Sequence, residues 1–311
     1  MSSSSSPSSP FSPNNPFASS TNPFTPSVTT TNPFSSVSSP TSPYASLSFR
    51  KTDTIRFLNF PPSVTSSLEA IVLASWPPGL ESQGSTTNSD KTGATSNCSV
   101  VEFKCKGRPF GHFNDQQRVG GLRMVRNVMI LLRNQGWEPA AALMCSRRYT
   151  AKDTLFFRQV GLARGEAAVV PEVEWAVISP MGMDKLRVVY DAEGVKPYDK
   201  VGGDEDAEGS DRDYLGVLIT KIKKTLQELG MFSKGDWSHD SFEFEFKSWV
   251  WRARGETSDA VRIMFMRLLE LMEDEGWRLY TSFVLYTGTD EKRILDSWYF
   301  VREKRSTAKA T

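Results

Sequence analysis

GGLRMVRNVMILLRNQGW at residues 120–137 and SDAVRIMFMRLLELMEDEGW at residues 258–277 are two versions of one pattern. In both stretches apolar residues recur three and four positions apart, which predicts an amphipathic helix with one buried face. Each stretch ends in Gly-Trp, where glycine can adopt the left-handed conformation that closes a helix and the aromatic ring can cover the last turn. The expected core positions are Val125, Val128, Met129 and Leu132 in the first helix and Val261, Phe265, Leu268, Leu269 and Met272 in the second.

The similarity extends to both sides of the two helices. Residues 99–110, SVVEFKCKGRPF, and residues 241–251, SFEFEFKSWVW, alternate apolar with polar residues and predict a strand before each helix. Two more strands are expected after each Gly-Trp. Residues 98–160 and 241–303 are therefore predicted to be two copies of one unit, in which the equivalent pairs are Trp137 with Trp277 and Phe157 with Phe300.

A further strand and helix precede each copy. They are expected at residues 55–60 and 66–76 in the first half and at 185–190 and 214–229 in the second. The predicted fold class is α+β, with two tandem repeats of a β-α-β-α-β-β two-layer unit preceded by a disordered tail. The expected boundaries are a tail at 1–49, a first repeat at 50–164 with a flexible insertion at 77–97, a second repeat at 165–305 with an acidic flexible loop at 191–213, and a disordered end at 306–311.

The last strand of each repeat begins with a related motif. Asp153 opens Asp-Thr-Leu-Phe-Phe and Asp296 opens Asp-Ser-Trp-Tyr-Phe, each following Gly-Trp and a strand. In this respect the body resembles a group of fungal proteins, and the resemblance implies no activity.

The first 49 residues differ in composition from the rest. They contain no Asp, Glu, Lys or Arg and are dominated by Ser, Thr, Pro and Asn, so they offer too little apolar surface to offset the entropy of ordering the chain. Within them the tripeptide Asn-Pro-Phe occurs three times, at residues 15–17, 22–24 and 32–34. Random shuffling of so biased a segment would give on the order of 0.1 copies, so the repetition indicates a recognition element, with accidental duplication as the alternative.

These tripeptides resemble the NPF peptides that bind Eps15-homology (EH) domains of endocytic and membrane-trafficking adaptors. Proline favours a turn from which Phe projects with little freedom left to lose, which suits capture by a pocket. The resemblance implies that each Phe fills an apolar pocket and that each Asn is hydrogen-bonded inside it. The implied partner-binding residues are Asn15, Pro16, Phe17, Asn22, Pro23, Phe24, Asn32, Pro33 and Phe34.

The tail also carries Ser-Pro or Thr-Pro dipeptides, which proline-directed kinases recognise. Phosphorylation would add roughly −1.5 to −2 charge per site beside the Phe residues and could regulate binding. The alternative is that a tail rich in Ser and Pro forms such dipeptides by chance. The candidate sites are Ser6, Ser9, Ser12, Thr25, Ser39 and Ser42.

The sequence contains no recognisable catalytic or metal-binding constellation. His112 and His239 stand near no cysteine and no spaced carboxylate pair, and no Gly-rich phosphate-binding motif occurs, so we expect no metal, no cofactor and no enzymatic activity. The three cysteines form no Cys-x-x-Cys pair and are expected to be reduced thiols. No apolar run approaches about 18 residues, so we expect no transmembrane segment and a cytoplasmic protein, located at endocytic sites on the cell cortex.

Charge is distributed unevenly and supports a second hypothesis. Residues 98–164 carry a net charge of +8, whereas residues 165–235 and 236–305 carry −5 and −3. A basic repeat could bind an anionic lipid or RNA, and the alternative is that its arginines simply pair with the acidic second half. The candidate anion-binding residues are Arg118, Arg123, Arg126, Arg147, Arg148 and Lys152, with Arg133 on the same helix.

The expected function is that of an interaction protein whose NPF tail recruits EH-domain adaptors in endocytosis or vesicle trafficking. The alternative is an anionic-lipid or nucleic-acid binding module that uses the basic first repeat.

Overall fold

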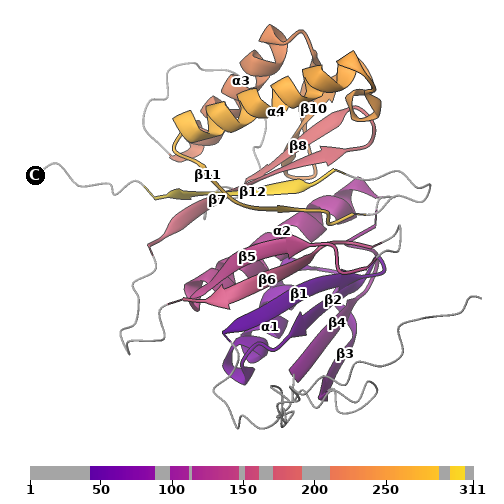
Figure 1. Cartoon of the computed structure of the whole chain (residues 1–311), viewed down its shortest axis with the longest axis vertical. Coiled ribbons are helices and arrows are strands. Elements are labelled where there is room, and N and C mark those ends of the chain that lie inside the picture. Colours follow the sequence, from indigo (N-terminus) through magenta and orange to yellow (C-terminus); the bar gives the residue numbers. More distant parts are fainter. Residues whose placement is uncertain are drawn as a thin grey trace, which may run out of the picture. The chain divides into compact units, whose positions relative to one another are not determined.

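Each half of the body forms a six-stranded antiparallel sheet that carries two helices (Figure 1). The computed structural model describes residues 43–87, 99–111, 114–146, 151–160, 171–190, 211–286 and 295–304. The first repeat contains β1 (Tyr44–Arg50), β2 (Thr54–Leu58), α1 (Pro62–Ser75), β3 (Leu80–Thr87), β4 (Ser99–Cys105), α2 (Asp115–Asn134), β5 (Trp137–Leu143) and β6 (Thr154–Gln159).

The second repeat has the same order of elements. It contains β7 (Val173–Met181), β8 (Lys185–Tyr190), α3 (Asp211–Glu228), β9 (Phe232–Ser238), β10 (Ser241–Phe246), the short 3-10 helix η2 (Val250–Arg252), α4 (Glu256–Asp274), β11 (Arg278–Phe283) and β12 (Ser297–Glu303). Sheet A has the strand order β3-β4-β2-β1-β6-β5, and sheet B has the equivalent order β9-β10-β8-β7-β12-β11. The predicted α+β class with two tandem repeats is confirmed.

Equivalent positions in the two repeats have the same strand register. In β5 and β6, Pro139 pairs with Phe157, and in β11 and β12, Leu279 pairs with Phe300. The register then shifts immediately after both pairs. Because a shift of one residue would turn every side chain to the other face, a shared register means that the two repeats use matching residues for their cores. The predicted equivalence of Phe157 and Phe300 is therefore confirmed.

The Gly-Trp pairs close α2 and α4 as predicted. Gly136 and Gly276 have φ of 77° and 78°, in the left-handed region that glycine enters without steric cost. Their amides donate to the carbonyls of Arg133 and Glu273 at 2.9 and 2.8 Å. The tryptophans that follow, Trp137 and Trp277, are buried in the two cores.

The predicted end of the tail at residue 49 is wrong. Residues 44–50 form β1, which lies inside sheet A and pairs with both β2 and β6. Ala45, Leu47 and Phe49 are buried, and the serines between them point to the other face of the strand. The serine content of this stretch resembles that of the preceding tail, although its alternation is that of a strand with one buried face.

The structure also contains strands that the sequence does not predict, namely β3, β7 and β9. β3 occupies part of the expected insertion at 77–97, and β9 is likewise a polar edge strand, so neither shows apolar alternation. β7 is buried on both faces and has no alternation to detect. Each repeat is therefore β-β-α-β-β-α-β-β.

The remaining boundaries are only partly described. The predicted end of the acidic loop at residue 213 is wrong, because α3 already begins at Asp211. Residues 88–98 and 191–210, the repeat boundary at 164, and the end at 306–311 lie outside the described residues.

The elements of the body alternate in four layers (Figure 1). α1 and α2 cover one face of sheet A, and α2 also contacts β7 and β8 of sheet B. The other face of sheet B packs against α3 and α4 through residues such as Ile178, Phe244 and Phe300. Helix α2 therefore lies between the two sheets.

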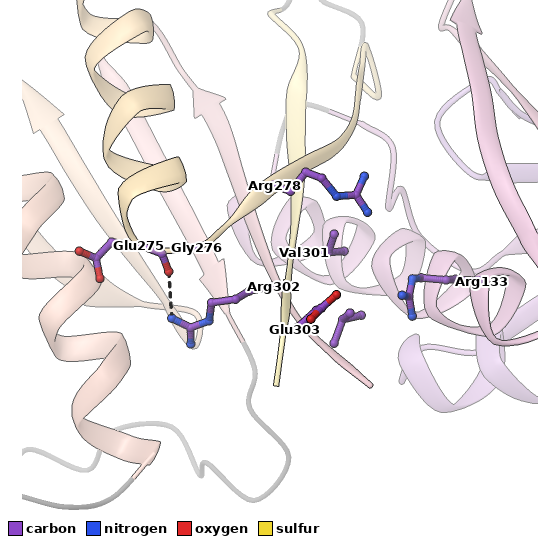
Figure 2. Close-up of a pocket in the computed structure, with 8 residues that line it drawn as sticks. Arg133, Glu275, Gly276, Arg278, Val301, Arg302 and Glu303 are labelled. Atoms are coloured by element: carbon purple, nitrogen blue, oxygen red, sulfur yellow. Dashed lines mark hydrogen bonds between the residues drawn. The ribbon is translucent and has the colours of Figure 1, made fainter. Parts of the chain in front are cut away.

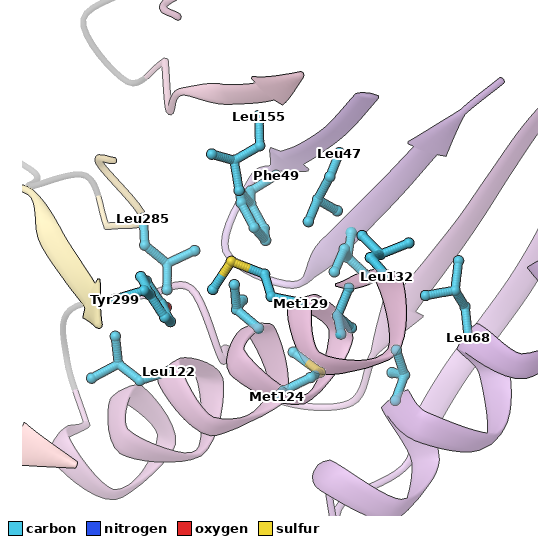
Figure 3. Packing of buried hydrophobic residues seen from close by; sticks show 14 of the residues in the cluster. Leu47, Phe49, Leu68, Leu122, Met124, Met129, Leu132, Leu155, Leu285 and Tyr299 are labelled. Atoms are coloured by element: carbon cyan, nitrogen blue, oxygen red, sulfur yellow. The ribbon is translucent and has the colours of Figure 1, made fainter. Parts of the chain in front are cut away.

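One hydrophobic core joins the two repeats. It contains Leu47 and Met129 from the first repeat together with Leu285 and Tyr299 from the second (Figure 3). Phe283 stacks between Phe49 of the first repeat and Tyr299 of its own, with ring centroids 5.8 and 5.1 Å away. The repeats therefore do not bury their apolar surfaces independently.

Candidate functional site

The motif residues of the tail lie outside the described part of the structure. These are Asn15, Pro16, Phe17, Asn22, Pro23, Phe24, Asn32, Pro33 and Phe34. The description begins at Pro43, and β1 follows at once.

Two of the candidate anion-binding arginines on α2 point into the interior. The Arg118 guanidinium donates to the carbonyl of Pro180 in the second repeat at 3.3 Å and lies 4.7 Å from the centroid of the Tyr286 ring. Burial lowers the pKa of Arg118 below its usual value. Arg126 is also buried and donates to the side chain of Asn127. These guanidinium groups are not placed where a large polyanion could contact them.

The other candidates are dispersed. Arg123 bonds to the carbonyls of His239 and Asp240, in the turn between β9 and β10, and lies 3.8 Å from the Asp240 carboxylate. Lys152 is buried and donates to the carbonyl of Lys51. Arg147 and Arg148 lie outside the described residues. The structure thus brings both Arg118 and Arg123 to the second repeat. Arg123 pairs with an acidic residue there, as the alternative interpretation expected, whereas Arg118 bonds to a backbone carbonyl.

A buried ion cluster connects α2 with sheet B. Arg187 is almost fully buried and bonds to Glu243, while Asp115, the first residue of α2, lies 3.8 Å from it. Burial alone would raise the pKa of Glu243, but the hydrogen bond from Lys185 and the charge of Arg187 outweigh this effect and hold the pKa below its usual value. The cluster satisfies its own charges, so its arrangement is that of a structural contact between the repeats.

A cleft of about 360 Å³ opens where the end of β12 meets α2 and the α4–β11 junction (Figure 2). The side chains of Val301 and Glu303 lie on the side of β12 that faces Arg133, and Arg302 lies on the other side (Figure 2). Arg302 pairs with Glu174, and its guanidinium lies 4.5 Å from the Trp277 ring centroid.

The charges of this cleft nearly balance. Its lining contains three arginines and two glutamates: Arg133, Arg278, Arg302, Glu275 and Glu303. Among the described residues, Arg278 and Glu303 have no hydrogen bond or ion pair through their side chains. Arg133 donates to the carbonyl of Pro171, so among the described residues two arginines and one glutamate of the lining have no ion pair. This small positive excess does not by itself assign a ligand class.

An exposed tryptophan lies at a place that the sequence analysis did not single out. Trp249 precedes η2 and is 60% exposed, whereas Trp251, two residues later, packs against the second core. The strand-like alternation of residues 241–251 would place both tryptophans on one face. Only the alignment of the repeats could have separated them, because Trp251 corresponds to the buried Phe110 and Trp249 to Arg108.

Two properties of the described residues bear on the class of site. No group of three His, Cys, Asp or Glu side chains is placed to hold a metal ion within the described ranges. In the same part of the chain, no helix has the length and apolar character that a membrane span requires.

The fold and these surfaces define a duplicated α+β protein in which two copies of one domain share a core. A single domain-family model matches the chain at residues 43–158 and 174–301, so the chain belongs to that family and contains its domain twice. The family description names no activity. Comparisons with curated proteins and with solved structures give no match.

Proposed function

We propose that this chain is a non-enzymatic interaction protein whose NPF tail recruits EH-domain adaptors in endocytosis or vesicle trafficking. The observation that carries the proposal is the presence of three Asn-Pro-Phe copies within a stretch that has no charged residue. The matched family domain begins at residue 43, so the motifs precede the domain and are an addition to it. The proposed location is the cytoplasm, at endocytic sites on the cell cortex.

The place where the tail joins the body suits display of the motifs. Phe34 stands nine residues before Pro43, and β1 is held by hydrogen bonds to strands on both sides. The motifs are therefore joined to the body through a strand that is paired on both sides.

Repetition would compensate for a weak single contact. One tripeptide buries little surface, so we expect a dissociation constant of roughly 0.1 to 1 mM for each copy. Successive Phe residues are separated by 7 and 10 positions. In a flexible chain this is roughly 15 to 20 Å, which permits rebinding or the bridging of closely spaced pockets.

The test is a titration of a purified EH domain, and of a protein with two EH domains in tandem, with the full chain. Phe17→Ala alone should weaken binding about two- to threefold, because two copies remain. The combined change of Phe17, Phe24 and Phe34 to Ala should abolish binding without altering the melting temperature of the body. Phe11→Ala is the matched control, because Phe11 follows Ser-Pro and not Asn-Pro. A triple variant that binds as well as the unchanged chain would refute the proposal.

Proline-directed phosphorylation would be a means of regulation in this scheme. Thr25 follows Phe24 directly, so a phosphate there would place negative charge beside an apolar anchor. The anionic-lipid or nucleic-acid alternative receives no support from Arg118, Arg126 or Lys152, which are buried.

A further inference from the structure

A rigid loop at one end of sheet B presents Trp249 to solvent. Val250 is buried, and the indole of Trp251 donates to the carbonyl of Lys185 at 2.9 Å and stacks on Phe265. The loop is therefore anchored on both sides of η2, while Trp249 itself remains 60% exposed. The packing of the loop therefore does not account for the exposed position of Trp249.

A second apolar side chain lies on the adjacent turn. The amide of Trp251 donates to the carbonyl of Met183 at 3.1 Å, which joins the loop to the turn between β7 and β8. Met183 is 38% exposed. The strand register places this turn and the end of β10 at the same end of sheet B, because Lys185 pairs with both Met181 and Glu245.

Three cationic residues lie within five positions of Trp249 in the sequence: Lys247, Arg252 and Arg254. The Arg252 guanidinium lies 5.4 Å from the centroid of the Trp249 ring. Lys247, Arg252 and Arg254 have no ion pair with the described residues. The carboxylates of the same segments are Asp184 and Glu256, and Glu256 opens α4, where the helix dipole favours a negative charge. The loop therefore combines apolar side chains with three cations that have no ion pair among the described residues, one of which lies over the Trp249 ring.

The first repeat shows that the fold does not require this combination. There the amide of Phe110 donates to the carbonyl of Thr52 at 2.9 Å, in the same way that Trp251 bonds to Met183. Thr52 thus stands where the second repeat has Met183. Phe110, the equivalent of Trp251, is fully buried and contacts Phe49, whereas Arg108, the equivalent of Trp249, is exposed. The exposed position of the loop therefore carries an arginine in the first repeat and a tryptophan in the second.

We propose that the tip formed by Met183, Lys247, Trp249, Arg252 and Arg254 docks on an anionic lipid surface. Trp249 and Met183 would enter the boundary between headgroups and acyl chains, where tryptophan is favoured, and the three cations would contact lipid phosphates and carboxylates. Single-stranded RNA fits less well, because it is bound by several aromatic rings along a groove and this tip presents one ring on a turn. No residue of the tail is needed for this contact.

The test is co-sedimentation of the full chain with vesicles of phosphatidylcholine alone and with about 30% phosphatidylserine. The unchanged chain should bind the anionic vesicles, and binding should weaken as salt is raised. Trp249→Ala should reduce the affinity about fivefold or more, and Arg252→Glu combined with Arg254→Glu about tenfold or more.

Matched controls come from the outer face of α4. Met266 is 54% exposed, and Arg262 and Arg267 pair with Asp259 and Glu270 on the helix surface. Met266→Ala should leave binding unchanged, as should Arg262→Glu combined with Arg267→Glu, which changes the net charge equally. The tail variant with Ala at positions 17, 24 and 34 should also bind normally, which separates this proposal from recruitment of EH domains.

Three outcomes would overturn the proposal. One is the absence of binding to anionic vesicles by the unchanged chain. Another is an equal loss in the control variants, which would indicate net charge alone. The third is tighter binding of a single-stranded oligonucleotide than of vesicles, with loss on Trp249→Ala, which would assign the tip to nucleic acid.

Discussion

Lys152 was predicted to face an anionic partner, and the structure places it in the interior. Its ammonium group donates to the carbonyl of Lys51 and lies 5.6 Å from the centroid of the Phe110 ring. Burial lowers the pKa of Lys152 to about 8, although the charge of Asp53 acts in the opposite direction. The loss of hydration thus outweighs the attraction of the carboxylate.

This pKa predicts a rise in stability at alkaline pH. Between pH 8 and about 10.5 the unfolded chain still holds the Lys152 proton and the folded chain does not, so the free energy of unfolding increases with pH. The Lys152 contribution should amount to about 2 to 3 kcal/mol, measured as the difference in pH dependence between the unchanged chain and Lys152→Met, because burial raises the pKa of Cys105 to about 12 and this opposes the increase in both chains. Urea unfolding at pH 7.5 and 10 measures it.

Lys104 is the control for this experiment. It is exposed, and its hydrogen bond to Glu81 raises its pKa. Lys104→Met should therefore keep the alkaline increase. Identical pH dependence in Lys152→Met and the unchanged chain would contradict the assignment.

Equivalent helices occupy different environments in the two repeats. α2 is buried on two faces, because sheet A lies on one and sheet B on the other, whereas α4 buries only Met264, Leu268 and Met272. The close approach around α2 depends on Gly121, where an added Cβ would lie 2.1 Å from the carbonyl oxygen of Pro109. The equivalent residue of α4, Val261, needs no such space.

Replacing glycine by alanine should therefore lower the free energy of unfolding in α2 and raise it in α3. Gly121→Ala should lower the free energy of unfolding by about 3 kcal/mol, because the backbone of residue 109 must move. Gly216→Ala in α3 has no heavy atom within 4 Å of the new Cβ and should raise it by about 0.5 to 1 kcal/mol. Thermal and urea unfolding check both values. Stabilisation by Gly121→Ala would show that the contact is not as tight as described.

At the scale of the whole molecule, the shared core couples the two repeats. Tyr286 of the second repeat is fully buried, donates to the carbonyl of Arg118 at 2.5 Å and lies beneath that guanidinium. Loss of this contact would expose apolar surface of both repeats to water, because Tyr286 and α2 belong to the same hydrophobic core. The body should therefore unfold as one unit despite its duplicated sequence.

Tyr286→Ala tests this coupling in the intact chain. The change should lower the free energy of unfolding by about 3 to 5 kcal/mol, since a large aromatic leaves a core cavity. A single calorimetric transition should remain, with equal calorimetric and van't Hoff enthalpies. Two separated transitions in the unchanged chain would show that the repeats fold independently.

The sequence by itself determined the duplication, the α+β class, the Gly-Trp caps and the matching of Phe157 with Phe300. These features depend on local periodicity and on glycine at helix ends, which act over a few residues. The NPF motifs were likewise readable without a structure. The Trp249 tip was not, because the same alternation applies to Trp249 and Trp251.

Only the tertiary structure decided which side chains have partners across the repeats. It assigned serine-rich residues 44–50 to the interior of a sheet, made the polar stretches of β3 and β9 into edge strands, and buried Arg118, Arg126 and Lys152. It also showed that sheet B covers the second face of α2, whereas the corresponding face of α4 is exposed to solvent. The physical reason is that burial of a strand or of a second helix face depends on elements distant in sequence, and a local pattern contains no information about which of them will cover it.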